Sequence, residues 1–233
     1  MDPYKLYTPQ KLMAKAQHNA YTKQMHRYDA LMTGRSWWGH LFMNGLWQVN
    51  QLEMAAEVLA MIPDDFAGRL LDVPVGTAVF TCDKYKQLAK AQITALDYSE
   101  KMLEMAAHRF EVEGVTNVSL VQGDVGTMPF ADGEFDYLLT MSGLQAFPDK
   151  ERALREMHRV LKPGGRLCGC FYVRGEHRVG DWIAHHILER KGYYCPPHYT
   201  ATEAVAVLRE LFGERLSVRQ YHAMLICSVV KDR

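Results

Sequence analysis

Seven short apolar runs follow one another along the chain after residue 68, and each has the length of a β-strand. They fall at residues 69–75, 91–96, 118–121, 135–140, 166–173, 215–221 and 223–230. Segments compatible with helices lie between the first five runs, at residues 83–90, 99–112 and 149–161, and the Lys-Pro-Gly-Gly sequence at 162–165 predicts a turn before the fifth run. This alternation predicts a parallel, doubly wound α/β sheet. The last two runs are nearly contiguous, which favours an antiparallel hairpin.

The residues before this region have a different pattern. Apolar side chains recur with loose helical spacing from about residue 9 to 61, and Pro63 ends the pattern. There is no linker, low-complexity tract or internal repeat. We therefore expect residues 1–62 to form an N-terminal helical cap on a domain of residues 63–233. The predicted fold class is α/β, a mostly parallel seven-stranded sheet with a C-terminal antiparallel hairpin.

Composition and charge narrow the classes of partner. The chain has 233 residues, and its formal net charge is zero because Lys and Arg number 27, as do Asp and Glu. Proteins that bind nucleic acids usually carry a basic excess, so no nucleic-acid partner is expected. No apolar run approaches the roughly 20 residues that span a bilayer. The N-terminus lacks the apolar core of a signal peptide, so we expect a cytoplasmic protein.

The cysteines do not indicate a metal or redox site. Five are scattered along the chain, at positions 82, 168, 170, 195 and 227. Cys168 and Cys170 share one face of a predicted strand, but no second pair or histidine cluster completes a zinc site. We expect buried, reduced thiols and no bound metal.

The end of the first predicted strand carries the first candidate ligand-binding segment. Asp72 ends an apolar run and is followed by Val73, Pro74 and Gly76. Glycine lets the backbone approach a ligand closely, and the Asp72 carboxylate is placed to accept hydrogen bonds from a cationic amine. Alternatively, Asp72 only orients the turn. A turn with three glycines would also have glycine at positions 74 and 78, where this chain has Pro74 and Ala78.

The ends of the second and third predicted strands carry two more acidic residues. Asp97 follows the Gly76 turn at about the spacing at which nucleotide-binding sheets place an acidic residue on the ribose hydroxyls. Its alternative role is to cap the next helix, for which Ser99 competes. Asp124 is a candidate acceptor for an adenine amino group, although Gly-Asp is also a common turn. Neighbouring candidates are Tyr98, Met102, Gly123 and Val125, and Met102 is equally plausible as a core residue.

The fourth strand ends at Met141 and Ser142, beside the first strand in this topology. Ligands of open α/β sheets bind outside the carboxyl ends of the strands, so we expect the main chain at these two residues to line the reactive part of the site. Ser142 lacks the Gly-x-Ser-x-Gly context of a nucleophile.

Taken in order, these segments resemble class I S-adenosylmethionine-dependent methyltransferases. Within that class the chain resembles the ubiquinone/menaquinone-biosynthesis C-methyltransferase-like group, known as methyltransferase type 11. The motifs that carry the resemblance are residues 71–77, 96–103, 123–125, 128–130, 135–136 and 159–165. The resemblance implies that S-adenosylmethionine is the cofactor and S-adenosylhomocysteine the product. It also implies that Asp72 and Gly76 meet the methionyl part, Asp97 the ribose and Asp124 the adenine.

The resemblance predicts methyl transfer to the oxygen, nitrogen or carbon atom of a small molecule by in-line displacement. A general base matters only if the acceptor must lose a proton. The candidate bases are His40, Tyr28, Tyr21 and His198, and the aromatic, proline-containing segment 193–199 is a candidate wall of the acceptor pocket. Two alternatives are a methyltransferase-like binding or partner protein without catalysis and a nicotinamide-dependent oxidoreductase. We expect a monomer or a homodimer.

Overall fold

The computed structural model describes residues 5–7 and 50–233. Of the predicted N-terminal helical cap, this includes the helix α4 (Gln51–Leu59), which begins at Asn50 as its N-cap. The rest of that prediction, over residues 8–49, lies outside the described residues, and so do Tyr21, Tyr28 and His40.

One mixed sheet organises the described chain, and it confirms the predicted fold class. Five strands are parallel, in the order β4-β3-β2-β5-β6, and β8 joins β6 in the antiparallel direction with β7 at the edge. Their bounds are β2 Arg69–Asp72, β3 Gln92–Asp97, β4 Val118–Gln122, β5 Phe135–Met141, β6 Leu161–Tyr172, β7 Leu216–Tyr221 and β8 Met224–Val230.

The structure adds an eighth strand that the sequence pattern did not predict. β1 (Lys5–Tyr7) pairs antiparallel with β4 at the other edge of the sheet. Three residues are too few to show the alternation that identifies a strand, and they adjoin a segment with helical spacing. The pairing occupies backbone groups that an edge strand leaves open.

The 162–165 segment, predicted as a turn, lies within β6. Phe135 pairs with Leu161 and Tyr137 with Arg166, so the intervening residues bulge out of the ladder. Gly164 has a positive φ of 79°, which glycine adopts without steric cost. A turn-forming sequence is therefore accommodated as an interruption of one long strand.

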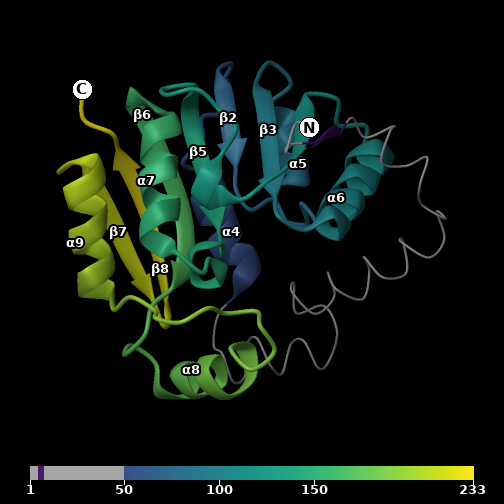
Figure 1. Cartoon of the computed structure of the whole chain (residues 1–233). Coiled ribbons are helices and arrows are strands. Elements are labelled where there is room, and N and C mark those ends of the chain that lie inside the picture. Colours follow the sequence, from purple (N-terminus) through teal and green to yellow (C-terminus); the bar gives the residue numbers. More distant parts are fainter. Residues whose placement is uncertain (1–4, 8–49) are drawn as a thin grey trace.

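Helices cover both faces of the sheet (Figure 1). The side chains of α4, α5 (Cys82–Gln87) and α6 (Glu100–Glu113) contribute to one buried apolar cluster, and those of α7 (Lys150–Val160) and α9 (Ala201–Phe212) contribute to a second. The predicted cap of α6 is confirmed, since Ser99 Oγ accepts a hydrogen bond from the Met102 N–H. In Figure 1, α8 (Arg178–Ile183) lies below the sheet, where the parallel strands end.

Part of the family-like sequence pattern stabilises the framework. The Arg159 guanidinium donates to the carbonyl oxygens of Phe130 (2.7 Å) and Met128 (3.1 Å), and to the carboxylates of Glu156 and Asp132. It therefore attaches the 128–132 loop to α7. Arg159, from one of the motifs that carry the resemblance, therefore meets Met128 and Phe130 from another.

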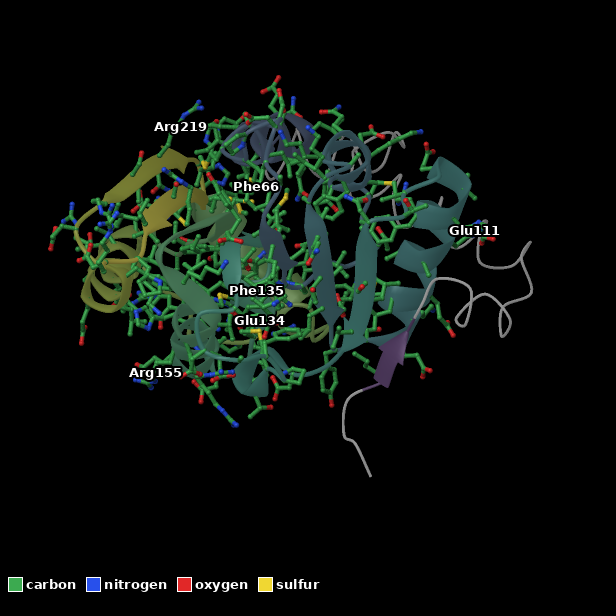
Figure 2. The ribbon with its side chains drawn as sticks, turned by 90° about the horizontal axis from the view of Figure 1, so that it is seen from above. Phe66, Glu111, Glu134, Phe135, Arg155 and Arg219 are labelled. Atoms are coloured by element: carbon green, nitrogen blue, oxygen red, sulfur yellow. The ribbon has the colours of Figure 1, made fainter. Side chains whose placement is uncertain are left out.

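We predict that Arg159→Gln lowers the free energy of unfolding by about 1–3 kcal/mol, because two main-chain carbonyls and two carboxylates lose their donor. Urea denaturation at neutral pH measures the change. Arg155→Gln is the matched control, since Arg155 makes an exposed i,i+4 pair with Glu151 and lies at the periphery of the molecule (Figure 2). Its loss should cost less than about 0.5 kcal/mol. Equal effects of the two substitutions would contradict the assigned role of Arg159.

Candidate functional site

Two buried carboxyl groups lie at the ends of adjacent parallel strands. Asp72 is the last residue of β2 and Asp97 the last of β3, and their exposed fractions are 1% and 7%. The turn after β2 connects them, because the Gly76 N–H donates to Asp97 Oδ2 at 2.9 Å. The structure therefore brings together two of the acidic residues that the sequence analysis placed at strand ends.

Asp72 has only one of its two oxygens paired. Tyr85, fully buried on α5, donates its hydroxyl to Asp72 Oδ2 at 2.6 Å. Asp72 Oδ1 is buried and has no hydrogen-bond partner among residues 5–7 and 50–233. Burial raises the pKa of Asp72 to about 7; the Tyr85 hydrogen bond opposes this rise and the nearby Asp97 adds to it. Burial of a carboxylate oxygen is unfavourable unless a hydrogen-bond donor or a cation meets it.

Asp97 is held by the main chain. Its Oδ2 accepts from Gly76 N–H and its Oδ1 from Ser99 N–H, each at 2.9 Å. Burial raises the pKa of Asp97, and the backbone hydrogen bonds from Ser99, Gly76 and Tyr98 lower it. Each oxygen of a carboxylate can accept more than one hydrogen bond, so both retain capacity for a hydroxyl. Asp97 also has part of its alternative role as a cap, because its carboxylate accepts from the N–H of Ser99, the N-cap residue of α6.

The turn after β2 tolerates its departures from the three-glycine pattern through local packing. A Cβ built on Gly143 would lie 2.3 Å from Pro74 Cδ and 2.8 Å from Phe147 Cζ, so the proline ring occupies the space next to a glycine. Gly76 and Ala78 both have φ of 56°, and a Cβ on Gly76 would meet nothing within 4 Å. Gly76 therefore presents bare backbone to open space, as a ligand-binding turn requires.

The third acidic position lies at the end of β4. Asp124 is exposed, and its Oδ1 accepts from the Gly126 N–H at 2.8 Å as the cap of a short 3-10 turn (Val125–Thr127). Gly123 N–H donates to the Asp97 carbonyl oxygen at 3.1 Å, which places this turn beside the second strand end. Val125 is buried behind it.

Tyr98 and Met102 differ in their exposure. The Tyr98 side chain is 79% exposed, whereas Met102 is half-buried in the first turn of α6. The other candidates, Met141 and Ser142, end β5 next to the β2 turn. Ser142 N–H donates to the Cys170 carbonyl oxygen at 2.8 Å and Ser142 has a φ of 53°, so this segment bends away from the sheet here.

His198 is the one candidate base within the described residues, and it is 7% exposed. Its Nε2 lies 3.2 Å from Glu189 Oε1, and its Nδ1 is buried with no partner in the described part of the chain. The rings of Tyr172 and Tyr194 contact the imidazole at centroid distances of 5.1 and 5.6 Å. Burial lowers the pKa of His198, nearby Lys150 lowers it further, and Glu189 raises it.

The 193–199 segment lies against the ends of β5 and β6. Cys195 N–H donates to the Gln145 carbonyl oxygen at 2.9 Å, and Gln145 Oε1 accepts from Tyr172 N–H at 3.2 Å. Lys150 Nζ donates to the carbonyl oxygens of Phe147 and Cys195. His198 therefore sits at the same edge of the sheet as Ser142, on the far side of β5 from Asp72.

Sequence reasoning missed Tyr85, Glu189 and Gly143. Tyr85 and Glu189 act through tertiary contacts with Asp72 and His198, and neither has a local sequence signal. The sequence shows that Gly143 follows Ser142, but only the folded structure shows that Gly143 lies against Pro74.

The described residues contain no group of three His, Cys, Asp or Glu side chains that could hold a metal. Among these residues, no helix has the length and apolar character needed to cross a membrane.

Comparison with curated proteins shows similarity over the strand-turn region. The chain is 45% identical over 100 residues to a demethylmenaquinone methyltransferase of Staphylococcus epidermidis, covering 42% of this chain and 41% of that protein. It is 39% identical over 99 residues to a demethylmenaquinone methyltransferase of Listeria welshimeri, with 42% of each chain covered. The similarity spans about two fifths of the length of these relatives.

Solved structures share the fold. An S-adenosylmethionine-dependent methyltransferase from Thermotoga maritima has a TM-score of 0.63 at 21% identity, covering 83% of this chain and 94% of that chain. Phosphoethanolamine N-methyltransferase 2 of Haemonchus contortus, in complex with S-adenosyl-L-methionine, has a TM-score of 0.66 at 16% identity, covering 78% and 53%. At these identities the similarity establishes the arrangement of the sheet and helices.

The family comparison covers the segment that carries the paired carboxylates. The methyltransferase domain family matches residues 71–169, from the last two residues of β2 into β6. This range contains Asp72, Asp97 and Asp124 and all the motifs on which the resemblance was based. Residues 71–169 therefore match a methyltransferase domain, as the sequence motifs indicated.

Proposed function

We propose that this protein binds S-adenosylmethionine at the carboxyl ends of β2, β3 and β4 and methylates a small molecule. The observation that carries the proposal is the buried Asp72 Oδ1, which has no partner within the described residues. An ammonium group is the partner that such an oxygen favours most, because a charge-assisted hydrogen bond offsets the cost of burial. The amino group of S-adenosylmethionine fits this requirement.

The remaining candidates follow from the position of that ammonium. Gly76 would lie along the methionyl part, with Val73 and Pro74 behind it, and Asp97 would accept from the ribose hydroxyls. Asp124 would accept from the adenine amino group. The other residues proposed to line the cofactor site are Tyr98, Met102, Gly123, Val125, Met141 and Ser142.

S-adenosylmethionine supplies an electrophilic methyl group on a sulfonium. The chain must hold donor and acceptor in line, an effect that reaches roughly 7–11 kcal/mol in ideal cases. Main chain at the end of β5 would fix the reactive end. This is supported by the hydrogen bond from Ser142 N–H to the Cys170 carbonyl oxygen and by the Pro74 ring, which fills the space beside Gly143.

We propose His198 as the general base for an acceptor with an ionisable hydroxyl. An ionised Glu189 can only accept a hydrogen bond, so it selects the tautomer with hydrogen on Nε2 and leaves the Nδ1 lone pair free. The lowered pKa keeps the imidazole neutral and able to accept a proton. Small phenols and quinols suit this arrangement, and the names of the relatives, demethylmenaquinone methyltransferases, point to the same class.

The proposed setting is that of a cytoplasmic enzyme with a small-molecule substrate, acting as a monomer or a homodimer. The absence of a suitable helix within the described residues and the balanced charge support this part of the proposal.

Calorimetric titration with S-adenosylmethionine, S-adenosylhomocysteine and NAD tests cofactor binding. We expect micromolar binding of the two sulfur compounds, none of NAD, and at least a tenfold loss of affinity in Asp97→Ala, because the ribose loses its acceptor. A melting curve of the variant checks that it folds. Equal affinity of Asp97→Ala and the parent would contradict the site assignment. Binding of neither sulfur compound would favour a partner protein without catalysis.

The burial of Asp72 also has a cost in the unliganded protein. Its folded-state pKa of about 7 lies above the ordinary value of 3.8. A raised acid pKa contributes stability at pH values below 3.8, and this contribution is lost as the pH rises through 7. A shift of about three units corresponds to a loss of up to about 4 kcal/mol. The unliganded fold therefore carries an unfavourable charge that a bound cation would neutralise.

We predict that Asp72→Asn raises the free energy of unfolding at pH 8 by on the order of 1–3 kcal/mol, because the buried charge is removed. The same variant should lose most of its affinity for S-adenosylhomocysteine. Urea denaturation at pH 8 and pH 5 measures the gain, which should shrink toward pH 5. The exposed Asp65 provides a control, since Asp65→Asn should change stability by less than about 0.5 kcal/mol at either pH. A destabilised Asp72→Asn would refute the account of Asp72.

We predict that His198→Asn slows methyl transfer about 10²–10⁴-fold without weakening cofactor binding, because the acceptor loses its base. Formation of S-adenosylhomocysteine from S-adenosylmethionine, with a panel of small phenols, quinols and amines as acceptors, measures the rate. His158→Asn is the control, because His158 packs on Phe212 in α9, away from the proposed site. An unchanged rate in His198→Asn with a phenol or quinol would exclude His198 as the base.

A further inference from the structure

We propose that Tyr85 is a positioning residue of the cofactor site, whose phenol fixes Asp72 Oδ2 and leaves Asp72 Oδ1 as the acceptor for the ammonium of the methyl donor. This inference rests on the proposed function. Tyr85 lies outside every strand-end segment that the sequence indicated, and it contributes to the site only through Asp72.

The geometry restricts the Asp72 carboxyl to one orientation. Tyr85 is fully buried on α5, and its hydroxyl lies 2.6 Å from Oδ2. The Asn117 amide donates to the carbonyl oxygens of Tyr85, Leu88 and Ala91, so the end of α5 is held from β4's side as well. Because the Tyr85 backbone is held by Asn117 and the Tyr85 hydroxyl is bonded to Oδ2, the Asp72 carboxyl has little freedom to rotate. The free oxygen therefore keeps one direction before any ligand arrives.

The phenol also favours the charged form that a cation needs. The Tyr85 hydrogen bond lowers the pKa of Asp72, whereas burial and the charge of Asp97 raise it. The Cys168 thiol faces the same carboxyl from β6, and burial raises its pKa to about 12, so it stays neutral between pH 5 and 9. Burial also raises the pKa of Tyr85 well above its usual range, so the phenol remains a donor. Of the groups around this carboxyl, Asp72 itself therefore changes charge near neutral pH.

These contacts predict a bell-shaped dependence of cofactor affinity on pH. Affinity rises as Asp72 ionises near neutral pH, and it falls again at higher pH as the amino group of the ligand loses its proton. Removal of the phenol should move only the rising limb. Asp97 receives main-chain hydrogen bonds from Gly76 and Ser99, which a change at Tyr85 leaves in place.

The test is titration of S-adenosylhomocysteine into the full chain from pH 5 to 9. In Tyr85→Phe, the rising limb should move up by about one pH unit, so affinity at pH 6.5 falls about tenfold. In Asp72→Asn, the affinity curve should lose the rising limb that Asp72 causes. Adding Tyr85→Phe to Asp72→Asn should then change the affinity no further. Tyr137→Phe is the matched control, because Tyr137 packs on Phe66 away from Asp72.

A limb that stays in place in Tyr85→Phe, or an affinity that falls equally at every pH, would overturn the positioning role. If Tyr85→Phe fails to fold, replacement of Tyr85 by a fluorotyrosine supplies a stronger donor of nearly the same shape. The limb should then move to lower pH, and an unmoved limb would again overturn the inference. A parent protein that does not bind S-adenosylhomocysteine at any pH would refute the proposed function instead.

Discussion

A carboxyl group buried at the end of a central strand is the constraint around which the site is arranged. Asp72 ends β2, between β3 and β5, where it is buried and, among residues 5–7 and 50–233, receives a side-chain hydrogen bond from Tyr85 alone. Leaving a charge in such a place is unfavourable unless an opposite charge or further donors arrive. The fold keeps the group there because strands, helix α5 and the Gly76 turn enclose it. In the proposed function, the ammonium group of the cofactor offsets this unfavourable burial.

The motifs that make the chain resemble methyltransferases have two different physical roles. Asp72, Gly76 and Asp97 lie together at the strand ends, where Gly76 N–H donates to Asp97 and the Tyr85 hydroxyl donates to Asp72. Arg159 and the 128–132 loop form another group that attaches one end of α7 to the loop before β5. Only the first group faces the proposed cofactor. The second holds the layer that covers the opposite face of the sheet from Tyr85.

The sequence predicted those features that depend on local pattern. The strands of the parallel sheet and the C-terminal hairpin follow from alternating apolar runs, and the Ser99 cap follows from its residue type. Strand β1 was missed because three residues carry too little pattern, and its partner β4 is more than a hundred residues away. The 162–165 segment was interpreted as a turn because Pro-Gly-Gly favours one, whereas pairing on both sides keeps it within β6.

The candidate site shows the same division. Asp72, Asp97 and Gly76 could be predicted because they end strands or follow them directly. Tyr85, Glu189 and Gly143 could not, because each is defined by a partner distant in the sequence. The residue types at positions 74 and 78 signalled a departure from the glycine pattern, but only the contact between Pro74 and Gly143 shows how the turn accommodates it.

A crystal structure of the protein with S-adenosylhomocysteine tests the central claim most directly. The account predicts the amino nitrogen of the ligand about 3 Å from Asp72 Oδ1, with the Tyr85 hydroxyl still on Oδ2 and the ribose hydroxyls on Asp97. A ligand whose amino group lies elsewhere, while Asp72 Oδ1 stays without a partner, would contradict it.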